Sequence, residues 1–174
     1  MDAPDPRYGL GLAQGDVRVV PHNPLWARAF VEESTRIMAA LGPVALAIEH
    51  YGSTAVPGLD AKPIIDMQIG VADLDDGLRF GPTFAALGYD LVTDHGIPDH
   101  HLYARGTIRT FFAHIALFES DEWFRTLRFR DRLRADPALR DAYRALKHDL
   151  AANAGSRRAY TDGKTDFVTL AGKA

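Results

Sequence analysis

The sequence predicts an α+β fold, with strands in the first two-thirds of the chain and helices in the last third. Two observations support this prediction. Up to about residue 118, short apolar segments alternate with Gly- and Pro-bearing turns, as in strands and hairpins. From Ser120 onward, apolar residues recur at helical spacing. Strands followed by helices are typical of an α+β arrangement and not of a doubly wound α/β sheet.

The first predicted helix follows a segment, residues 1–15, that is rich in Gly and Pro and is expected to be flexible. Asn23 marks the start of the helix as its N-cap, and Pro24 suits the first helical position. Apolar residues then recur at helical spacing until Gly42, namely Trp26, Phe30, Ile37 and Leu41.

Five strands are predicted beyond this helix, at residues 46–51, 63–71, 89–93, 100–105 and 109–118. Gly106-Thr107 joins the last two strands as a hairpin. A helical stretch at residues 73–87, broken near Gly81-Pro82, separates the second strand from the third. Three C-terminal helices follow, with caps at Ser120, Asp136 and Ser156.

Length and composition limit the kind of protein. A chain of 174 residues without repeats or linkers is expected to form one domain over residues 1–174, in which residues 120–174 supply the C-terminal helices. The sequence has no Cys, which excludes disulfides and thiolate metal sites. It shows neither a signal peptide nor a segment long enough to span a membrane, so we expect a cytoplasmic protein without a membrane partner.

The charges are unevenly distributed. The net charge of −3 argues against a protein built mainly to bind nucleic-acid backbone. Residues 1–120 hold 8 Lys/Arg and 15 Asp/Glu, whereas residues 121–174 hold 12 and 8. A cleft between an acidic half suited to a metal and a basic half suited to phosphate would use this asymmetry. Alternatively, the Arg-rich helices are simply well solvated.

A single carboxylate, Asp66, stands in the most apolar predicted strand. Alternation places Ile65, Met67, Ile69 and Val71 on one face and Ile64, Asp66, Gln68 and Gly70 on the other. An unpaired carboxylate among apolar residues is costly, so Asp66 needs a cation or hydrogen-bond donors. It is either a structural residue bonded to backbone N–H groups or a metal ligand beside a nucleotide site.

The turn before this strand, Gly52-Ser53-Thr54, brings backbone N–H groups and two hydroxyls to one place and suits an anion. Together with Asp66 it resembles the nucleotidyltransferase pattern, in which Gly-Ser holds the triphosphate and carboxylates hold Mg²⁺. The chain departs from that pattern at Gln68, which is a poor Mg²⁺ ligand. A later strand carries His114, which is a core histidine, a metal ligand, a general base or a hydrogen-bond donor to Asp66.

The histidine-rich segment DHGIPDHH (94–101) superficially suggests a second metal site. His100 and His101 are neighbours on a predicted strand, so their side chains point to opposite faces and do not readily share one ion. We therefore expect this segment to be a solvent-exposed loop.

The run EHYGSTAVPGLDAKPIIDMQIGV (49–71) resembles the signature of the GrpB family, and the resemblance extends through ARGTIRTFFAHIALFE (104–119) and LRFRDRLRADP (127–137) to YTDGKTDFV (160–168). It implies a nucleotidyltransferase-like fold, a mixed β-sheet with flanking helices and a C-terminal helical segment. The family brings no defined reaction with it.

The family motifs map onto specific positions of this chain. They imply catalytic or metal-binding roles for Asp66 and His114, with Mg²⁺ as the expected metal. They also imply a substrate-binding set made of Gly52, Ser53, Thr54, Lys62, Arg130, Lys147, Tyr160 and Lys164, to which Gln68 is added from its place beside Asp66 on the strand. Lys62 suits either phosphate or Asp66, and Arg130 suits either phosphate or an ion pair that fixes a helix to the sheet.

Three functions remain open at this level. The first is nucleotidyl transfer from a nucleoside triphosphate with Mg²⁺ to an unknown acceptor. The second is a binding module for a nucleotide or another phosphorylated small molecule that has lost two-metal chemistry. The third is a metal-independent enzyme that uses His114 as a base oriented by Asp66.

Overall fold

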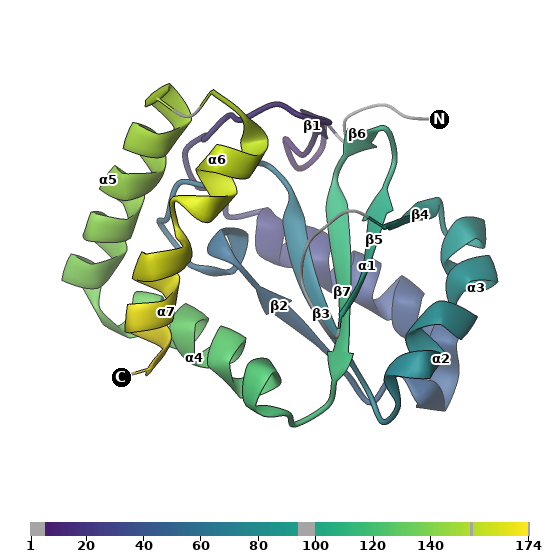
Figure 1. The fold of residues 1–174 in the computed structure, drawn as a ribbon. Coiled ribbons are helices and arrows are strands. Elements are labelled where there is room, and N and C mark those ends of the chain that lie inside the picture. Colours follow the sequence, from purple (N-terminus) through teal and green to yellow (C-terminus); the bar gives the residue numbers. More distant parts are fainter. Residues whose placement is uncertain (1–5, 94–99, 154, 174) are drawn as a thin grey trace.

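A five-stranded mixed sheet forms the centre of the fold in the computed structural model, which describes residues 6–93, 100–153 and 155–173 (Figure 1). Only β3 and β7 run parallel; the other neighbouring pairs are antiparallel. The strand order is β2 (Ala47–Tyr51), β3 (Ile65–Val71), β7 (Phe111–Leu117), β5 (His101–Arg105) and β4 (Tyr89–Val92). The five predicted strands are confirmed, and the sheet is mixed, as the resemblance implied.

One face of the sheet packs on the first helix and forms the main core. The helix α1 (Trp26–Leu41) lies behind the sheet in Figure 1. Ile65, Met67, Ile69 and Val71 are fully buried against it, as the alternation predicted. The broken helical stretch is confirmed as α2 (Leu74–Arg79) and α3 (Gly81–Ala86), which cover the same core with Phe80 and Phe84.

The start of α1 differs slightly from the prediction. The helix begins at Trp26, two residues later than Pro24 suggested, after a turn in which Trp26 N–H bonds the Asn23 carbonyl. The side chain of Asn23 still accepts a hydrogen bond from Leu25 N–H at 3.0 Å. Asn23 therefore stabilises the first turn as a capping residue does.

The C-terminal segment contains four helices where the sequence indicated three. They are α4 (Asp121–Ala135), α5 (Pro137–Asn153), α6 (Arg157–Asp162) and α7 (Thr165–Lys173). The predicted caps are confirmed, because Ser120, Asp136 and Ser156 accept from Trp123, Leu139 and Ala159 N–H. The extra break falls at Gly163, where a Cβ would lie 2.5 Å from a methyl group of Leu150. The lack of a side chain at residue 163 lets the segment between α6 and α7 lie close to α5.

The N-terminal segment is partly packed, in contrast to the flexible start that its Gly and Pro content suggested. Tyr8, Leu10 and Leu12 are buried, and β1 (Leu12–Ala13) pairs with β6 (Ile108–Arg109). The alternating apolar residues explain the difference, since each second side chain reaches the core. Residues 1–5 lie outside the described residues.

Candidate functional site

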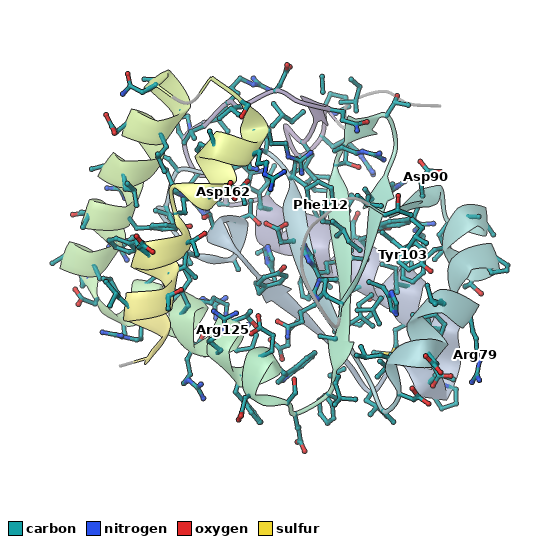
Figure 2. All side chains as sticks on the ribbon, in the orientation of Figure 1. Arg79, Asp90, Tyr103, Phe112, Arg125 and Asp162 are labelled. Atoms are coloured by element: carbon teal, nitrogen blue, oxygen red, sulfur yellow. The ribbon has the colours of Figure 1, made fainter. Side chains whose placement is uncertain are left out.

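A cleft of about 720 Å³ opens on the face of the sheet opposite α1. This volume is in the range of small-molecule sites. The sheet forms its floor, and α6 with Lys164, the residue before α7, forms one wall. Figure 2 shows Phe112 of β7 and Asp162 of α6 on this side of the molecule. Predicted site residues that line the cleft are Ser53, Thr54, Lys62, Asp66, His114, Tyr160 and Lys164.

Asp66 lies on the floor of the cleft between two aromatic residues. The sheet register aligns it with Tyr51 on β2 and Phe112 on β7, so the three side chains share one face. The side chain of Asp66 is 31% exposed, and its Oδ1 lies 3.6 Å from Nε2 of His114. No hydrogen bond to its carboxylate is found among residues 6–93, 100–153 and 155–173. Asp66 is therefore open to a ligand.

Gly52 is required by the position of Asp66. A Cβ at residue 52 would lie 2.6 Å from Oδ2 of Asp66, and the φ of +71° is one that side-chain-bearing residues rarely adopt. The glycine lets the turn approach the carboxylate closely. It thus acts through shape and is not among the residues that line the cleft.

The two hydroxyls of the turn have different surroundings. Thr54 is 3% exposed, and its Oγ1 lies 3.0 Å from Nε2 of His50. Burial lowers the pKa of His50 to about 4, so His50 is neutral at neutral pH. Ser53 lines the cleft, and its hydroxyl lies close enough to Tyr143 to lower the pKa of that phenol, against the larger raising effect of burial. The turn is a short 3₁₀ segment, Ser53–Ala55, and offers less to a triphosphate than the motif suggested.

Three cations face the cleft without a carboxylate partner. Nζ of Lys62 and Nζ of Lys164 lie 5.1 and 4.4 Å from the ring centroid of Tyr160. The guanidinium of Arg157 lies 5.3 Å from the ring centroid of Phe112. In the part of the chain that the structure describes, none of the three forms an ion pair within 4.0 Å. We call Lys62, Arg157 and Lys164 the cleft cations.

The pKa values of the cleft cations reflect their surroundings. Burial, followed by the charge of Lys62, lowers the pKa of Lys164 to about 7. Burial also lowers the pKa of Lys62, opposed by the negative charge of Asp66, and the pKa of Arg157. Burial raises the pKa of Tyr160 to about 12. Each cation is thus held in a place where its charge is unfavourable unless an anion is near.

His114 is buried at the edge of this site. Its Nε2 points toward Asp66 and has no hydrogen-bond partner. Its Nδ1 lies 2.7 Å from Nε2 of His100, a contact that the sequence did not suggest. His101 instead lies 3.0 Å from the carbonyl of Leu74, so the two adjacent histidines diverge as expected. Residues 94–99 of the histidine-rich segment lie outside the described residues.

Besides Gly52, three predicted substrate-binding residues do not line the cleft. Gln68 is buried, and its amide oxygen accepts a 2.5 Å hydrogen bond from Thr126 on α4. Arg130 bonds Glu49, Asp131 and the carbonyl of His50. Lys147 is the third of these residues. For Arg130 the structural alternative is the one found, because its long side chain fixes α4 to the sheet.

Lys147 is almost fully buried on α5 and donates to the carbonyl of Asp60. Its ammonium also lies 5.0 Å from the ring centroid of Tyr143. Burial, with the charge of Lys164, lowers its pKa to about 7. With Arg134 and Arg144, which donate to the carbonyls of Ala55 and Gly58, Lys147 ties the C-terminal helices to the loop that carries the turn.

The cleft has few groups that could hold a metal. Within the described ranges no cluster of three or more His, Asp or Glu suits a metal ion. Mg²⁺ prefers oxygen ligands and is often bound by one or two carboxylates plus substrate phosphates. Asp66 fits such a role for one ion shared with a ligand. A second ion finds no carboxylate on the floor of the cleft, since Gln68 is neutral and already bonded.

Sequence reasoning missed three site residues, Tyr51, Phe112 and Arg157. The first two become neighbours of Asp66 only through the register of β2 and β7. Arg157 lies in the first turn of α6, whose position over the sheet is set by tertiary packing. The signal available in the sequence was alternation, which places Phe112 and His114 on one face of the same strand.

Comparison with known proteins relates most of the chain to one family. Residues 16–173 match the family model described as GrpB protein. The UPF0157 protein YqkA of Bacillus subtilis is 36% identical over 157 residues, which cover 89% of this chain and 46% of YqkA. This chain thus spans about half the length of that relative. The glutamate-rich protein GrpB of Alkalihalophilus pseudofirmus is 32% identical over 166 residues, 91% of this chain and 95% of the relative.

A solved structure has the same fold. The crystal structure of the conserved protein GrpB from Enterococcus faecalis superposes with a TM-score of 0.82 at 33% identity, and covers 90% of this chain and 95% of that one. The mixed sheet with flanking helices and a C-terminal helical segment is therefore a shared architecture. In the described part of the chain, we find no helix with the length and apolarity needed to cross a membrane.

Proposed function

The chain belongs to the GrpB family, and we propose that its cleft binds a phosphorylated small molecule, with a nucleotide as one candidate. The observation that carries this proposal is the set of three cleft cations without a carboxylate partner. Ammonium and guanidinium groups are the usual protein partners of phosphate. An anion at this place would offset the repulsion between Lys62 and Lys164.

The shape of the cleft supports a ligand larger than phosphate alone. The cations stand on the side of α6 and α7, while Ile64, Leu102 and Phe112 supply an apolar surface on the sheet. Ligand sites commonly combine such an apolar lining with a few polar groups that fix orientation. The phosphate would lie at the cleft cations, and the organic part would lie over the sheet.

Nucleotidyl transfer is the more specific function that the motif implies, and it needs more than this site offers. Two-metal chemistry requires carboxylates that hold both metal ions beside the reacting phosphate. Within the described ranges Asp66 is the one floor carboxylate, and Gln68 is bonded to Thr126 at the place of the second. Mg²⁺ bound at Asp66 would neutralise charge on ligand phosphates; the chain itself would supply the cleft cations. We therefore favour binding without nucleotidyl transfer.

Acid/base chemistry is a second candidate, and one observation favours it. Nε2 of His114 is buried, unpartnered and directed to the cleft beside Asp66. A neutral imidazole at this position could accept a proton from a ligand hydroxyl. Under this alternative His114→Gln abolishes turnover of a phosphorylated substrate while the ligand still binds.

Thermal denaturation with a panel of ligands tests the proposal. We expect inorganic phosphate, phosphorylated sugars or nucleotides to raise the melting temperature, and at equal concentration the ligand that binds more tightly should raise it more. Lys164→Met should remove this stabilisation, and Arg128→Met, a charge loss at an exposed position of α4, should retain it. If no phosphorylated compound stabilises the protein at millimolar concentration, the proposal is wrong. Release of pyrophosphate from a nucleoside triphosphate with Mg²⁺ would instead support transfer.

A further inference from the structure

The cleft contains charges of both signs that do not pair with each other. Asp66 and Lys62 are four residues apart and both line the cleft, yet no ion pair within 4.0 Å joins Asp66 to any lysine or arginine that the structure describes. An isolated half-buried carboxylate and isolated half-buried ammonium groups are each unfavourable. Their separation suits a ligand with complementary charges at two ends.

We propose that the cleft binds a small molecule that carries an amine as well as a phosphate, with the ammonium at Asp66 and the phosphate at the cleft cations. This inference rests on the proposed function and adds the second charged group of the ligand. It assigns Asp66, Tyr51 and His114 to recognition of the amine.

The surroundings of Asp66 favour an organic cation over a metal ion. Tyr51 and Phe112 flank Asp66 across the strands. The Phe112 ring already meets the guanidinium of Arg157, so Tyr51, whose ring centroid lies 5.1 Å from that of His114, is the aromatic neighbour that we assign to the amine. Aromatic rings next to a carboxylate attract ammonium groups through the face of the ring. Mg²⁺ at the same place would have to complete its octahedral set of about six oxygens from water and ligand atoms, because the sheet floor supplies one carboxylate among the described residues.

The small number of free oxygen atoms near Asp66 also favours an organic cation over a metal ion. Among the residues that the structure describes, Asp66 supplies the one carboxylate of the sheet floor, and its Oδ2 packs against Gly52, at 2.6 Å from the place of a Cβ. The amide oxygen of Gln68 is engaged by Thr126. Oδ1 is therefore the atom best placed to accept a hydrogen bond from an ammonium, while Nε2 of His114 offers a second acceptor when it is unprotonated.

The opposite end of the ligand is fixed by the cleft cations. Lys62 and Lys164 approach the same Tyr160 ring, and two like charges in one partly buried place attract a dianion such as a phosphate monoester. The negative charge of Asp66 repels the phosphate from the end of the cleft where Asp66 lies. The two ends together give the ligand a single orientation.

Matched pairs of ligands that differ only in the amine provide the test. We suggest glucosamine 6-phosphate against glucose 6-phosphate, and O-phosphoethanolamine against the phosphate monoester of ethylene glycol, measured by isothermal titration calorimetry in EDTA. A charge-assisted hydrogen bond in a partly closed site is expected to make at least one amine bind about tenfold or more tightly than its hydroxyl partner. Asp66→Asn should remove this preference and leave affinity for the hydroxyl ligand within about threefold.

The outcomes separate this inference from the proposed function. If amine and hydroxyl ligands bind wild type equally in both pairs, or if Mg²⁺ is required for binding, the inference about the amine is overturned and the phosphate site stands. If none of the four compounds binds while a nucleotide or another phosphorylated compound stabilises the protein, the inference about the amine fails and the phosphate site stands; if no phosphorylated compound binds, both fail. If Asp66→Asn retains the amine preference while Lys164→Met loses all binding, the phosphate end is supported and Asp66 is not the amine site.

Discussion

Replacing Lys164 with Met should stabilise the unliganded protein and weaken ligand binding at the same time. Lys164 is held partly buried beside Lys62, with Arg157 and Lys147 also contributing positive charge and Asp66 opposing them. Lowering its pKa from 10.5 to about 7 corresponds to roughly 5 kcal/mol at 1.36 kcal/mol per pH unit. Because the side chain keeps some contact with water, we expect about 1–3 kcal/mol of stabilisation at pH 6.

The pH dependence of this effect follows from linkage. Between about pH 7 and 10.5 the unfolded chain retains the Lys164 proton while the folded protein has released it, so the stability of wild type rises with pH in this window. Below pH 7 both states hold the proton, and the cost of the buried charge is present in full. The advantage of Lys164→Met is therefore largest at pH 6 and disappears toward pH 10.5.

Urea denaturation of wild type and Lys164→Met at pH 6, 7.5 and 9 measures this difference. At about 2–4 °C per kcal/mol for a chain of this size, the melting temperature of the variant should exceed that of wild type by several degrees at pH 6. Arg128→Met on α4 serves as the control and should change neither stability nor binding. A destabilised Lys164→Met variant at pH 6, or a difference that does not depend on pH, would refute the reasoning.

Three further predictions concern the surroundings of the cleft. Gly52→Ala should lower the free energy of unfolding by more than about 1 kcal/mol, measured in urea, because its Cβ meets Asp66 and the backbone is left-handed; unchanged stability would show that the turn can relax. Thr126→Val should lower the free energy of unfolding by about 1–3 kcal/mol, because it leaves the Gln68 amide oxygen buried and unpaired. A change below about 0.5 kcal/mol, which is a roughly neutral effect, would mean that water replaces the hydroxyl. Removing Mg²⁺ with EDTA should leave calorimetric affinity for glucose 6-phosphate unchanged, since the cleft cations neutralise the phosphate; a loss would assign that task to the metal.

The sequence predicted the parts of the fold that depend on local pattern. Alternation along residues 63–71 placed Asp66 on the face away from the main core, and that face forms the floor of the cleft. The caps at Ser120 and Ser156 were predictable because a hydroxyl before an apolar-periodic segment satisfies free N–H groups of the first turn. The break at Gly163 was not, since it depends on contact with Leu150 of another helix.

The roles of the long basic side chains could not be predicted in the same way. Lys147, Arg130 and Lys164 all suit phosphate by residue type, yet Lys147 and Arg130 donate to backbone carbonyls and carboxylates of the fold. Lys164 alone of the three faces the cleft. The choice depends on which way each helix presents its residues, and that direction is set by tertiary packing.

The most direct test of the central claim is a crystal structure of the protein grown with glucose 6-phosphate. We predict phosphate density between the ammonium groups of Lys62 and Lys164, with the guanidinium of Arg157 in contact and the sugar over Phe112 and Leu102. Phosphate bound at the backbone of Ser53 and Thr54 with the lysines turned away, or ligand density only outside the cleft, would contradict the account.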